Sequence, residues 1–252
     1  MIEVIRFTNL TPKLFDEVSY SRGRPVVIAD ALDGLPDWSL NFISESLGDR
    51  RFPVRIYGPD FRTKRKADWR RYCASAHYSA REYVQLLRNR SAHDRSMYMA
   101  QVRFAHTPLS AAISRPIEAL QEHCDLEPSA ETSLWLGPSG HTEPLHYDVG
   151  HGTLMQLHGA KRVILFPPTE AANLYPFPQG GPIPPHFSRI DTDRPDFSTF
   201  PRYREALTRR VELILNHGEV LFIPSKWWHE VTALGGDYVC SVNRFWKSKV
   251  AS

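Results

Sequence analysis

The first half of the chain alternates short strand patterns with helical ones. Residues 24–32 (RPVVIADAL) form a β-branched run suited to a buried strand, and residues 96–104 (SMYMAQVRF) also predict a strand. Residues 37–48 (DWSLNFISESLG) place apolar side chains at helical spacing and end in glycine, which predicts a helix. Residues 79–90 (SAREYVQLLRNR) predict a second helix, because a serine cap is followed three residues later by glutamate. We expect such mixed elements over residues 1–130.

From about Thr132 the pattern changes to short β runs that glycine and proline interrupt. Seven runs follow one another closely: TSLWLG, HGTLMQLHG, KRVILFPP, VELILNHG, EVLFIP, HEVTAL and YVCSVNRFW. This spacing is typical of an antiparallel barrel or a double-sheet jelly roll and not of βαβ units. With no repeat or clear linker, we predict a mainly β fold with helical N-terminal elements. It forms a single domain over residues 1–252, with a barrel core at residues 131–247.

One Pro-rich stretch interrupts the strand pattern at about residues 173–206. Its sequence, NLYPFPQGGPIPPHFSRIDTDRPDFSTFPRYREA, is too irregular for a core. Long ordered loops on a rigid scaffold often carry function. We therefore expect this insertion to cover the mouth of the barrel.

Composition limits the class of protein. Hydrophobic residues make up 42% and charged residues 23% of the chain, as in an ordinary soluble globular protein. The sequence has no apolar run near the roughly 18 residues of a membrane span, and its start lacks the features of a secretory signal. Cys73, Cys124 and Cys240 are odd in number and far apart, which favours free thiols in a reducing compartment. We expect a cytoplasmic protein.

The net charge of +3 is mild, but residues 61–71 (FRTKRKADWRR) concentrate Lys and Arg. Such runs are usually solvated surface loops or helix faces. The alternative is a binding surface for an acidic peptide or for RNA backbone.

Two polar side chains in one strand-like segment indicate a metal site. Alternation along EPLHYD places His146 and Asp148 on the same side of a strand. His229, after two tryptophans in LFIPSKWWHEV, offers a third ligand from another strand. Two imidazoles and a carboxylate form the facial triad of non-haem Fe(II) oxygenases. His-x-Asp alone is a weak signal, and a surface or hydrogen-bonded histidine is the alternative for each position.

Lys161 follows His146 by 15 residues, past a turn at Gly159. An unpaired lysine inside a barrel would be costly. A dicarboxylate co-substrate would remove that cost, because its 2-oxo acid end would bind iron while its far carboxylate pairs with Lys161. The alternative is a surface lysine beside Arg162.

An ordered set of motifs runs through the chain: WLG, PLHYD, QLHGAKRVILFPP, LYPFP, D-x-x-x-P-D-F, FP, GEVLFIPSKWWHEV and VNRFW. In this order they closely resemble the JmjC and cupin-like-domain oxygenases. The sequence is most similar to the branch that holds the hypoxia-pathway asparaginyl hydroxylase, other small protein hydroxylases and a wybutosine tRNA hydroxylase. The resemblance covers nearly the whole chain, because residues 24–32 also match that branch.

The resemblance implies a double-stranded β-helix, which is a cupin-like jelly roll, and the use of Fe(II), 2-oxoglutarate and O2. By position, His146, Asp148 and His229 match the iron ligands, and Lys161 matches the lysine that pairs with the distal carboxylate of 2-oxoglutarate. The positions matched near the co-substrate are Tyr98, Asn243 and Thr142, and those matched on the substrate side are Gln101, Trp228 and His151.

Three departures from the branch stand near the predicted site. Glu143 replaces a hydroxyl residue and would repel a dicarboxylate unless it turns away or the strand register shifts. Gly152 replaces an asparagine, and Arg244 stands between Asn243 and the Phe-Trp pair. The branch's C-terminal dimerisation extension is not matched after Trp246, so both a monomer and a homodimer stay open.

The leading hypothesis is hydroxylation of a protein or peptide side chain, with succinate and CO2 as co-products, and it rests mainly on the resemblance. Lysine demethylation is less favoured, because the sequence shows no reader module. Hydroxylation of a modified tRNA base or of a small natural product is the second enzyme hypothesis, with residues 61–71 as the RNA contact. A non-catalytic cupin that binds a metal or ligand is the alternative of another class.

Overall fold

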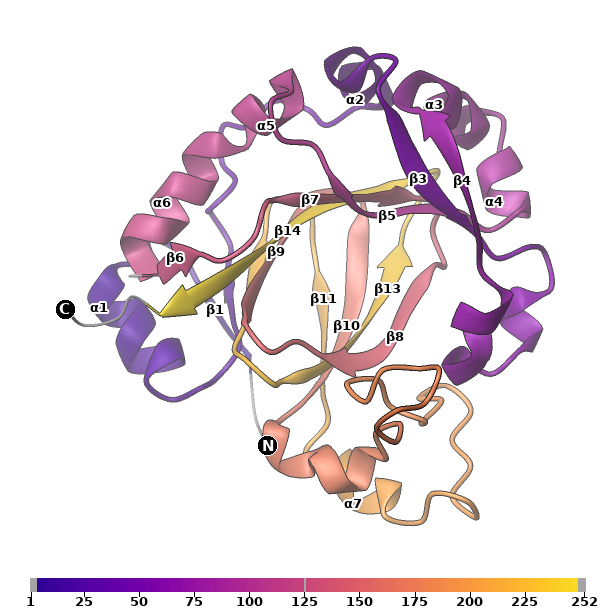
Figure 1. The fold of residues 1–252 in the computed structure, drawn as a ribbon. Helices are drawn as coiled ribbons and strands as arrows, with labels where there is room; N and C mark the ends of the chain where they lie inside the picture. The colour runs from indigo at the N-terminus through magenta and orange to yellow at the C-terminus, as the bar shows by residue number, and fades with distance from the viewer. Residues whose placement is uncertain (1–3, 125, 249–252) are drawn as a thin grey trace.

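Two β-sheets pack face to face, and most of the helices surround the outer side of the larger sheet (Figure 1). The computed structural model describes residues 4–124 and 126–248. The larger sheet consists of β1 (Ile5–Phe7), β2 (Val26–Ile28), β3 (Arg51–Ile56), β4 (Ala74–Ser79), β5 (Met97–Arg103), β6 (Leu126–Pro128), β7 (Ser133–Gly137), β9 (His151–His158), β12 (Val220–Ile223) and β14 (Val239–Ser248). The smaller sheet consists of β8 (Thr142–Tyr147), β10 (Ala160–Phe166), β11 (Val211–Leu215) and β13 (Trp228–Leu234).

Helices are short and lie mainly in the N-terminal half. They are α1 (Pro12–Phe15), α2 (Leu40–Leu47), α3 (Ala80–Arg88), α4 (Ser91–Asp94), α5 (Pro108–Ala112), α6 (Ser114–Cys124) and α7 (Tyr203–Leu207). A π-helical turn spans Asp16–Tyr20, and 3₁₀ turns span Phe61–Thr63, Lys66–Tyr72 and Pro168–Leu174. None of the described helices is both long and apolar enough to cross a membrane.

The sheet topology confirms the predicted jelly roll. The larger sheet runs in the order β1-β2-β12-β9-β14-β7-β5-β3-β4, with β6 beside β14, and the smaller sheet runs β11-β10-β13-β8. Consecutive strands β9 and β10 belong to different sheets, so the chain changes sheet at Gly159. Gly159 has a φ of +72°, a conformation that glycine adopts without strain. This corner carries Lys161 into the smaller sheet.

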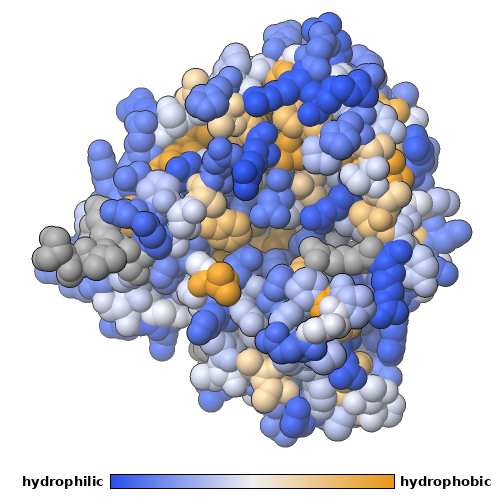
Figure 2. Space-filling view, viewed as in Figure 1, coloured by the Kyte–Doolittle hydropathy of each residue, from blue (hydrophilic) through white to orange (hydrophobic). Residues whose placement is uncertain are grey.

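The apolar core has two main layers around the larger sheet. One lies between that sheet and the helices, where Trp38, Tyr83 and Phe104 are almost fully buried. The other lies between the two sheets and fills one end of the barrel with Val27, Val163, Leu165, Val211, Leu215 and Leu221. Hydrophilic side chains cover most of the face drawn in Figure 2, with small hydrophobic patches towards its centre. The polar side chains that line the pocket lie towards the other end of the barrel.

The predicted elements agree with the observed ones where the sequence pattern is strong. The helix expected at residues 79–90 is α3, and Ser79 and Glu82 form the predicted capping box, with the Ser79 hydroxyl accepting from the Glu82 amide at 3.1 Å. The helix expected at residues 37–48 is α2. The strand at residues 24–32 shortens to β2. Strands β3 and β4 and helices α5 and α6 were not predicted.

The insertion between β10 and β11 packs on the outer face of the smaller sheet. Leu174, Ile190 and Phe200 from this segment form an apolar cluster with strand residues including Trp228. Its residues His186 and Phe187 reach the pocket inside the barrel. The segment expected to cover the barrel mouth therefore lies beside that mouth.

Cys73 is half-buried and Cys240 is buried, and both are free thiols. Burial raises the pKa of the Cys240 thiol to about 12. The side chain of Cys124 lies outside the described part of the chain.

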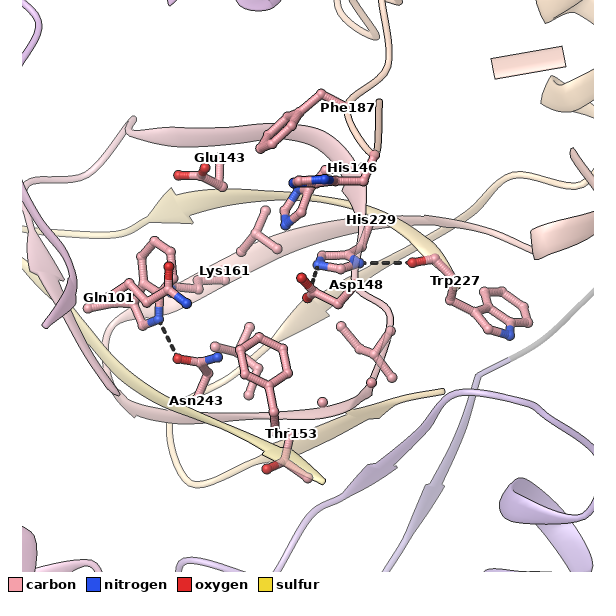
Figure 3. Close-up of a pocket in the computed structure, with 18 of the residues that line it drawn as sticks. Gln101, Glu143, His146, Asp148, Thr153, Lys161, Phe187, Trp227, His229 and Asn243 are labelled. Atoms are coloured by element: carbon pink, nitrogen blue, oxygen red, sulfur yellow. Dashed lines mark hydrogen bonds and ion pairs between the residues drawn. The ribbon is translucent and has the colours of Figure 1, made fainter. Parts of the chain in front are cut away.

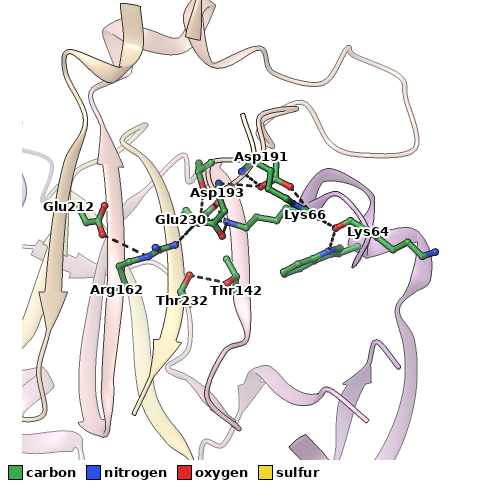
Figure 4. A network of polar contacts seen from close by, with 12 residues as sticks. Lys64, Lys66, Thr142, Arg162, Asp191, Asp193, Glu212, Glu230 and Thr232 are labelled. Atoms are coloured by element: carbon green, nitrogen blue, oxygen red, sulfur yellow. Dashed lines mark hydrogen bonds and ion pairs between the residues drawn. The ribbon is translucent and has the colours of Figure 1, made fainter. Parts of the chain in front are cut away.

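The charge run at residues 61–71, expected to be solvated, is buried at one position. Lys66 is only 4% exposed, and its Nζ lies 2.6 Å from Glu230 Oε1 and 2.7 Å from Asp193 Oδ2 (Figure 4). Phe61 and Trp69 are also buried. Lys66 is therefore fixed by a buried ion pair with Glu230 on β13, whereas Lys64, Arg65 and Arg71 are exposed.

We expect Lys66→Met to lower the free energy of unfolding by about 3–5 kcal/mol, because it leaves Glu230 buried without its nearest cation. Denaturant unfolding measures the change. The matched control is Lys64→Met at an exposed position two residues earlier, expected within about 0.5 kcal/mol of the wild type. Equal stability of the two variants would contradict the buried pair.

Candidate active site

One pocket opens between the two sheets at the end of the barrel that the insertion reaches (Figure 3). Side chains from both sheets and from the insertion line it. The opposite end is closed by the apolar layer between the sheets. The pocket therefore collects the inward polar side chains of the barrel.

His146, Asp148 and His229 lie together in this pocket. His146 is on β8, Asp148 follows the end of β8, and the pairing of β8 with β13 sets His229 directly opposite His146. One ligand atom from each residue lies within 4.8 Å of the others. The predicted triad is thus brought together by strand pairing between residues far apart in the sequence.

Backbone carbonyls orient both imidazoles. Nδ1 of His146 donates to the Pro144 carbonyl at 2.8 Å, and Nδ1 of His229 donates to the Trp227 carbonyl at 3.0 Å. Each ring therefore presents its other nitrogen, and Nε2 of His229 lies 3.4 Å from Asp148 Oδ2. Second partners of this kind fix the tautomer of a metal-ligating histidine. The donor set fits a divalent transition metal.

Burial and the neighbouring charges set the protonation of these groups. Burial, together with the charge of His229, lowers the pKa of His146 to about 4. Burial would raise the pKa of Asp148, but its hydrogen bond and charge interaction with His229 lower it overall. Burial would lower the pKa of His229, but the contact with Asp148 raises it overall. At neutral pH His146 is neutral and Asp148 is ionised, which are the states that bind a metal.

Lys161 enters the same pocket from β10. Its side chain is 3% exposed, donates to the hydroxyl of Ser241 and lies 5.9 Å from the ring centre of Trp135. Burial lowers the pKa of Lys161 to about 8. The alternative of a surface lysine is therefore wrong. A buried ammonium without a carboxylate partner at hydrogen-bond distance suits an anionic ligand.

Two further predicted residues lie beside Lys161. Tyr98 on β5 is 2% exposed, and its ring stacks on His141 at a centroid distance of 3.7 Å. Asn243 on β14 accepts a hydrogen bond from Nε1 of Trp135 at 2.8 Å. Both residues line the pocket, as expected for positions near the co-substrate.

The ring of Tyr98 occupies the space that a side chain at position 137 would need. A Cβ on Gly137 would lie 2.1 Å from Cδ2 of Tyr98. We expect Gly137→Ala to displace Tyr98, to lower the free energy of unfolding by about 1–3 kcal/mol and to weaken 2-oxoglutarate binding. Denaturant unfolding and equilibrium dialysis measure these changes. Gly236→Ala is the control because a Cβ there meets nothing within 4 Å, and equal effects of the two substitutions would contradict the close contact.

Gln101 reaches the pocket through an irregular strand. The register of β5 against β7 shifts between Met99 and Val102, and Gln101 has a φ of +55°. A β-bulge of this kind re-aims a side chain. Gln101 accordingly lines the pocket, which is the placement predicted from the sequence.

The structure does not bring Thr142, Trp228 or His151 to the pocket lining. Thr142 Oγ1 lies 2.9 Å from Thr232 Oγ1 on the outer side of the smaller sheet (Figure 4). Trp228 precedes His229 on β13, so alternation turns it into the core beneath the insertion. His151 accepts from the Ser225 amide at 3.2 Å. These three placements correct the sequence prediction.

A bulge in β8 explains the exchange of Thr142 for Glu143. Opposite β13, His229 pairs with His146 but Val231 pairs with Glu143, so β8 holds one extra residue between these pairs. Glu143 therefore faces the same pocket as His146. The register shift considered from the sequence is present, but it turns Glu143 inward.

The structure also shows the positions of Arg244 and Gly152, the other two departures from the branch. Arg244 turns away from the pocket and donates to Thr132 Oγ1 at 2.6 Å. Gly152 lines the pocket, and a Cβ there would meet Phe245 at 3.7 Å, an ordinary contact. Phe245 lines the pocket two residues after Asn243, as strand alternation requires.

Sequence reasoning missed several residues of the pocket. Arg55 comes from β3, a strand with a central proline that was not predicted. Phe187 comes from the insertion, and its ring stacks on His146 at a centroid distance of 5.1 Å. His141 and Trp135 flank Tyr98. Alternation past Asn243 could have identified Phe245, whereas no local pattern marks Arg55.

Comparisons with known proteins agree with this geometry. The profile described as "Cupin-like domain" matches residues 12–252. JmjC domain-containing protein D of Dictyostelium discoideum is 30% identical over 86% of this chain and 50% of its own length. Lysine-specific demethylase 8 of Xenopus tropicalis is 32% identical over 88% of this chain and 48% of its own length. Lysine-specific demethylase JMJ30 of Arabidopsis thaliana is 30% identical over 92% of this chain and 52% of its own length.

This chain spans about half the length of these relatives. The match nevertheless covers the strands that carry the triad and Lys161. The chain belongs to the cupin-like, JmjC-type family of oxygenases, which use Fe(II) and 2-oxoglutarate.

Proposed function

We propose that the protein is a 2-oxoglutarate-dependent dioxygenase that hydroxylates a side chain of a protein or peptide, with succinate and CO2 as co-products. The observation that carries the proposal is the convergence of the His146, Asp148 and His229 ligand atoms in the pocket that also holds buried Lys161. Three metal ligands alone would suit many metalloproteins. The nearby ammonium adds a site for a carboxylate.

Different residues of the pocket have different proposed roles. His146, Asp148 and His229 would hold Fe(II), which, when bound, supplies the activation of O2 coupled to oxidative decarboxylation of 2-oxoglutarate. Lys161 pairs with the distal carboxylate of the co-substrate and fixes its orientation. The apolar layer between the sheets closes the barrel at the end opposite the pocket opening and limits the access of water to the site.

A macromolecular substrate is supported by the pocket mouth. Phe187, Gln101 and Phe245 line the pocket, and Val149, directly after the ligand Asp148, is 81% exposed. An exposed apolar side chain beside the pocket would add apolar contact with a bound peptide. The names of two relatives also refer to lysine, a protein side chain.

Lysine demethylation is the second candidate, because two relatives carry that name. It would use the same chemistry, with hydroxylation at an N-methyl carbon. The tRNA hypothesis has less support, because Lys66 of the basic segment is buried against Glu230. The non-catalytic cupin hypothesis leaves the buried Lys161 without a role.

The test is incubation with Fe(II), 2-oxoglutarate and three substrate sets: unmodified peptides, methyl-lysine peptides and tRNA. Succinate is measured together with the mass of each substrate. Gain of one oxygen atom on an unmodified peptide supports the proposal, and formaldehyde release from a methyl-lysine peptide identifies demethylation. If 2-oxoglutarate binds but no set gives succinate above the background, the protein is a non-catalytic cupin for these substrates.

A further inference from the structure

The pocket holds one further pair of charged side chains in addition to Lys161. Arg55 Nη1 on β3 lies 2.9 Å from Glu143 Oε2 on β8. Both side chains line the pocket, with exposures of 25% for Arg55 and 12% for Glu143. The pair joins the edge region of the larger sheet to the bulge of the smaller one.

The Glu143 carboxyl group is ionised in this pocket. Burial would raise the pKa of Glu143, but its contact with His141 and the charge of Arg55 lower it well below the ordinary value. Burial lowers the pKa of Lys161, and the charge of Glu143 partly opposes that shift; both side chains line the same pocket, so the two groups are within electrostatic reach. An ionised glutamate beside the lysine would repel the distal carboxylate of a dicarboxylic acid.

His141 provides an independent sign that this part of the pocket takes a polar ligand. The residue is 5% exposed and lines the pocket, and neither ring nitrogen has a hydrogen-bond partner among the described residues. Its Nε2 lies 3.9 Å from Glu143 Oε2, beyond hydrogen-bond distance. Buried polar atoms are normally satisfied, so a ligand with polar groups suits this space.

We propose that Arg55 is a specificity-determining residue, which allows the pocket to accept a dicarboxylic 2-oxo acid by neutralising Glu143. This inference rests on the proposed function. Lys161 and Arg55 contribute two positive charges and Glu143 one negative charge, so these three side chains together leave one positive charge for a carboxylate. Without Arg55 that balance is lost, and Glu143 competes with the ligand for Lys161.

The test compares two 2-oxo acids on the metal-loaded protein without O2. 2-Oxoglutarate has a distal carboxylate, and 2-oxobutyrate does not. We expect Arg55→Met to weaken 2-oxoglutarate binding about tenfold or more and to leave 2-oxobutyrate binding within about threefold of the wild type. Arg55→Lys, which keeps the charge, should retain most of the affinity for 2-oxoglutarate.

A second substitution separates charge balance from loss of structure. Arg55→Met combined with Glu143→Gln should bind 2-oxoglutarate within about threefold of the wild type, because no unpaired carboxylate remains. Arg51→Met is the matched control on the same strand, where the side chain is 55% exposed and pairs with Glu82. Metal affinity and the free energy of unfolding are measured for every variant.

The outcomes distinguish this inference from the proposed function. Failure of the wild type to bind 2-oxoglutarate with metal would overturn both. Normal binding by the wild type and by Arg55→Met would overturn the role of Arg55 alone. Equal loss of both 2-oxo acids, or no rescue by Glu143→Gln, would show a structural role and would also overturn the inference.

Discussion

Replacement of His229 by alanine is expected to abolish metal binding and turnover while the fold persists. The ligand atoms of His229, His146 and Asp148 converge within 4.8 Å, and two ligands would remain. Removing the group that hydrogen-bonds a metal ligand lowers metal affinity about 10- to 100-fold. Removing the ligand itself should therefore lower metal affinity more than about 100-fold. Anaerobic titration with Fe(II) measures the affinity, and Asp148→Ala should behave alike.

The control for this prediction is His151→Ala. His151 is close to the triad in the sequence but does not line the pocket, and it accepts a hydrogen bond from the Ser225 amide. Its loss should leave Fe(II) affinity within about threefold of the wild type. Retained affinity in His229→Ala, or equal losses in both variants, would show that the metal binds elsewhere.

The second large effect is expected from Lys161→Met, which keeps the apolar stem and removes the charge. The 2-oxoglutarate concentration needed for half-maximal binding should rise about 30-fold or more, because loss of one partner of a buried charge pair costs about 2–5 kcal/mol. Metal affinity should stay near that of the wild type, since Lys161 lies outside the ligand set. Unchanged 2-oxoglutarate affinity would mean that the co-substrate does not reach Lys161.

The pKa of Lys161 adds a dependence on pH. Burial lowers this pKa from 10.5 to about 8 in the folded protein. Between these values the unfolded chain holds a proton that the folded chain has released, so the ligand-free protein gains stability as pH rises through this window. A carboxylate binds the protonated ammonium, so 2-oxoglutarate affinity should fall as pH rises above about 8. Lys161→Met should show neither trend, and affinity that is constant to pH 10 in the wild type would contradict this assignment.

Strand patterns were sufficient to predict the centre of the site. Alternation identified His146 and Asp148, because both project from one short segment at the end of β8. The turn at Gly159 indicated that Lys161 begins a new strand, and the fold adds that this strand belongs to the other sheet. Each of these inferences depends on neighbours within about 15 residues, where the geometry of a strand is nearly fixed.

The rest of the site depends on contacts that local patterns do not encode. The bulge in β8 exchanges Thr142 for Glu143 at the pocket, and only the pairing with β13 sets its position. Arg55 lies on a strand with a central proline, which lowers its strand signal. Lys66 looks like part of a solvated run because its partners, Asp193 and Glu230, are more than 120 residues away. In each case the deciding contact joins residues far apart in the sequence, or the local signal is weakened by proline.

The most direct test of the central claim is anaerobic titration of the protein with 2-oxoglutarate, in the presence and absence of Fe(II). Binding is followed by equilibrium dialysis and by the visible charge-transfer absorption of a 2-oxo acid at a ferrous site. We expect tight, Fe(II)-dependent binding in the wild type that is lost in His229→Ala and strongly weakened in Lys161→Met. Binding that does not require Fe(II), or that persists in both variants, would contradict the assignment of this pocket.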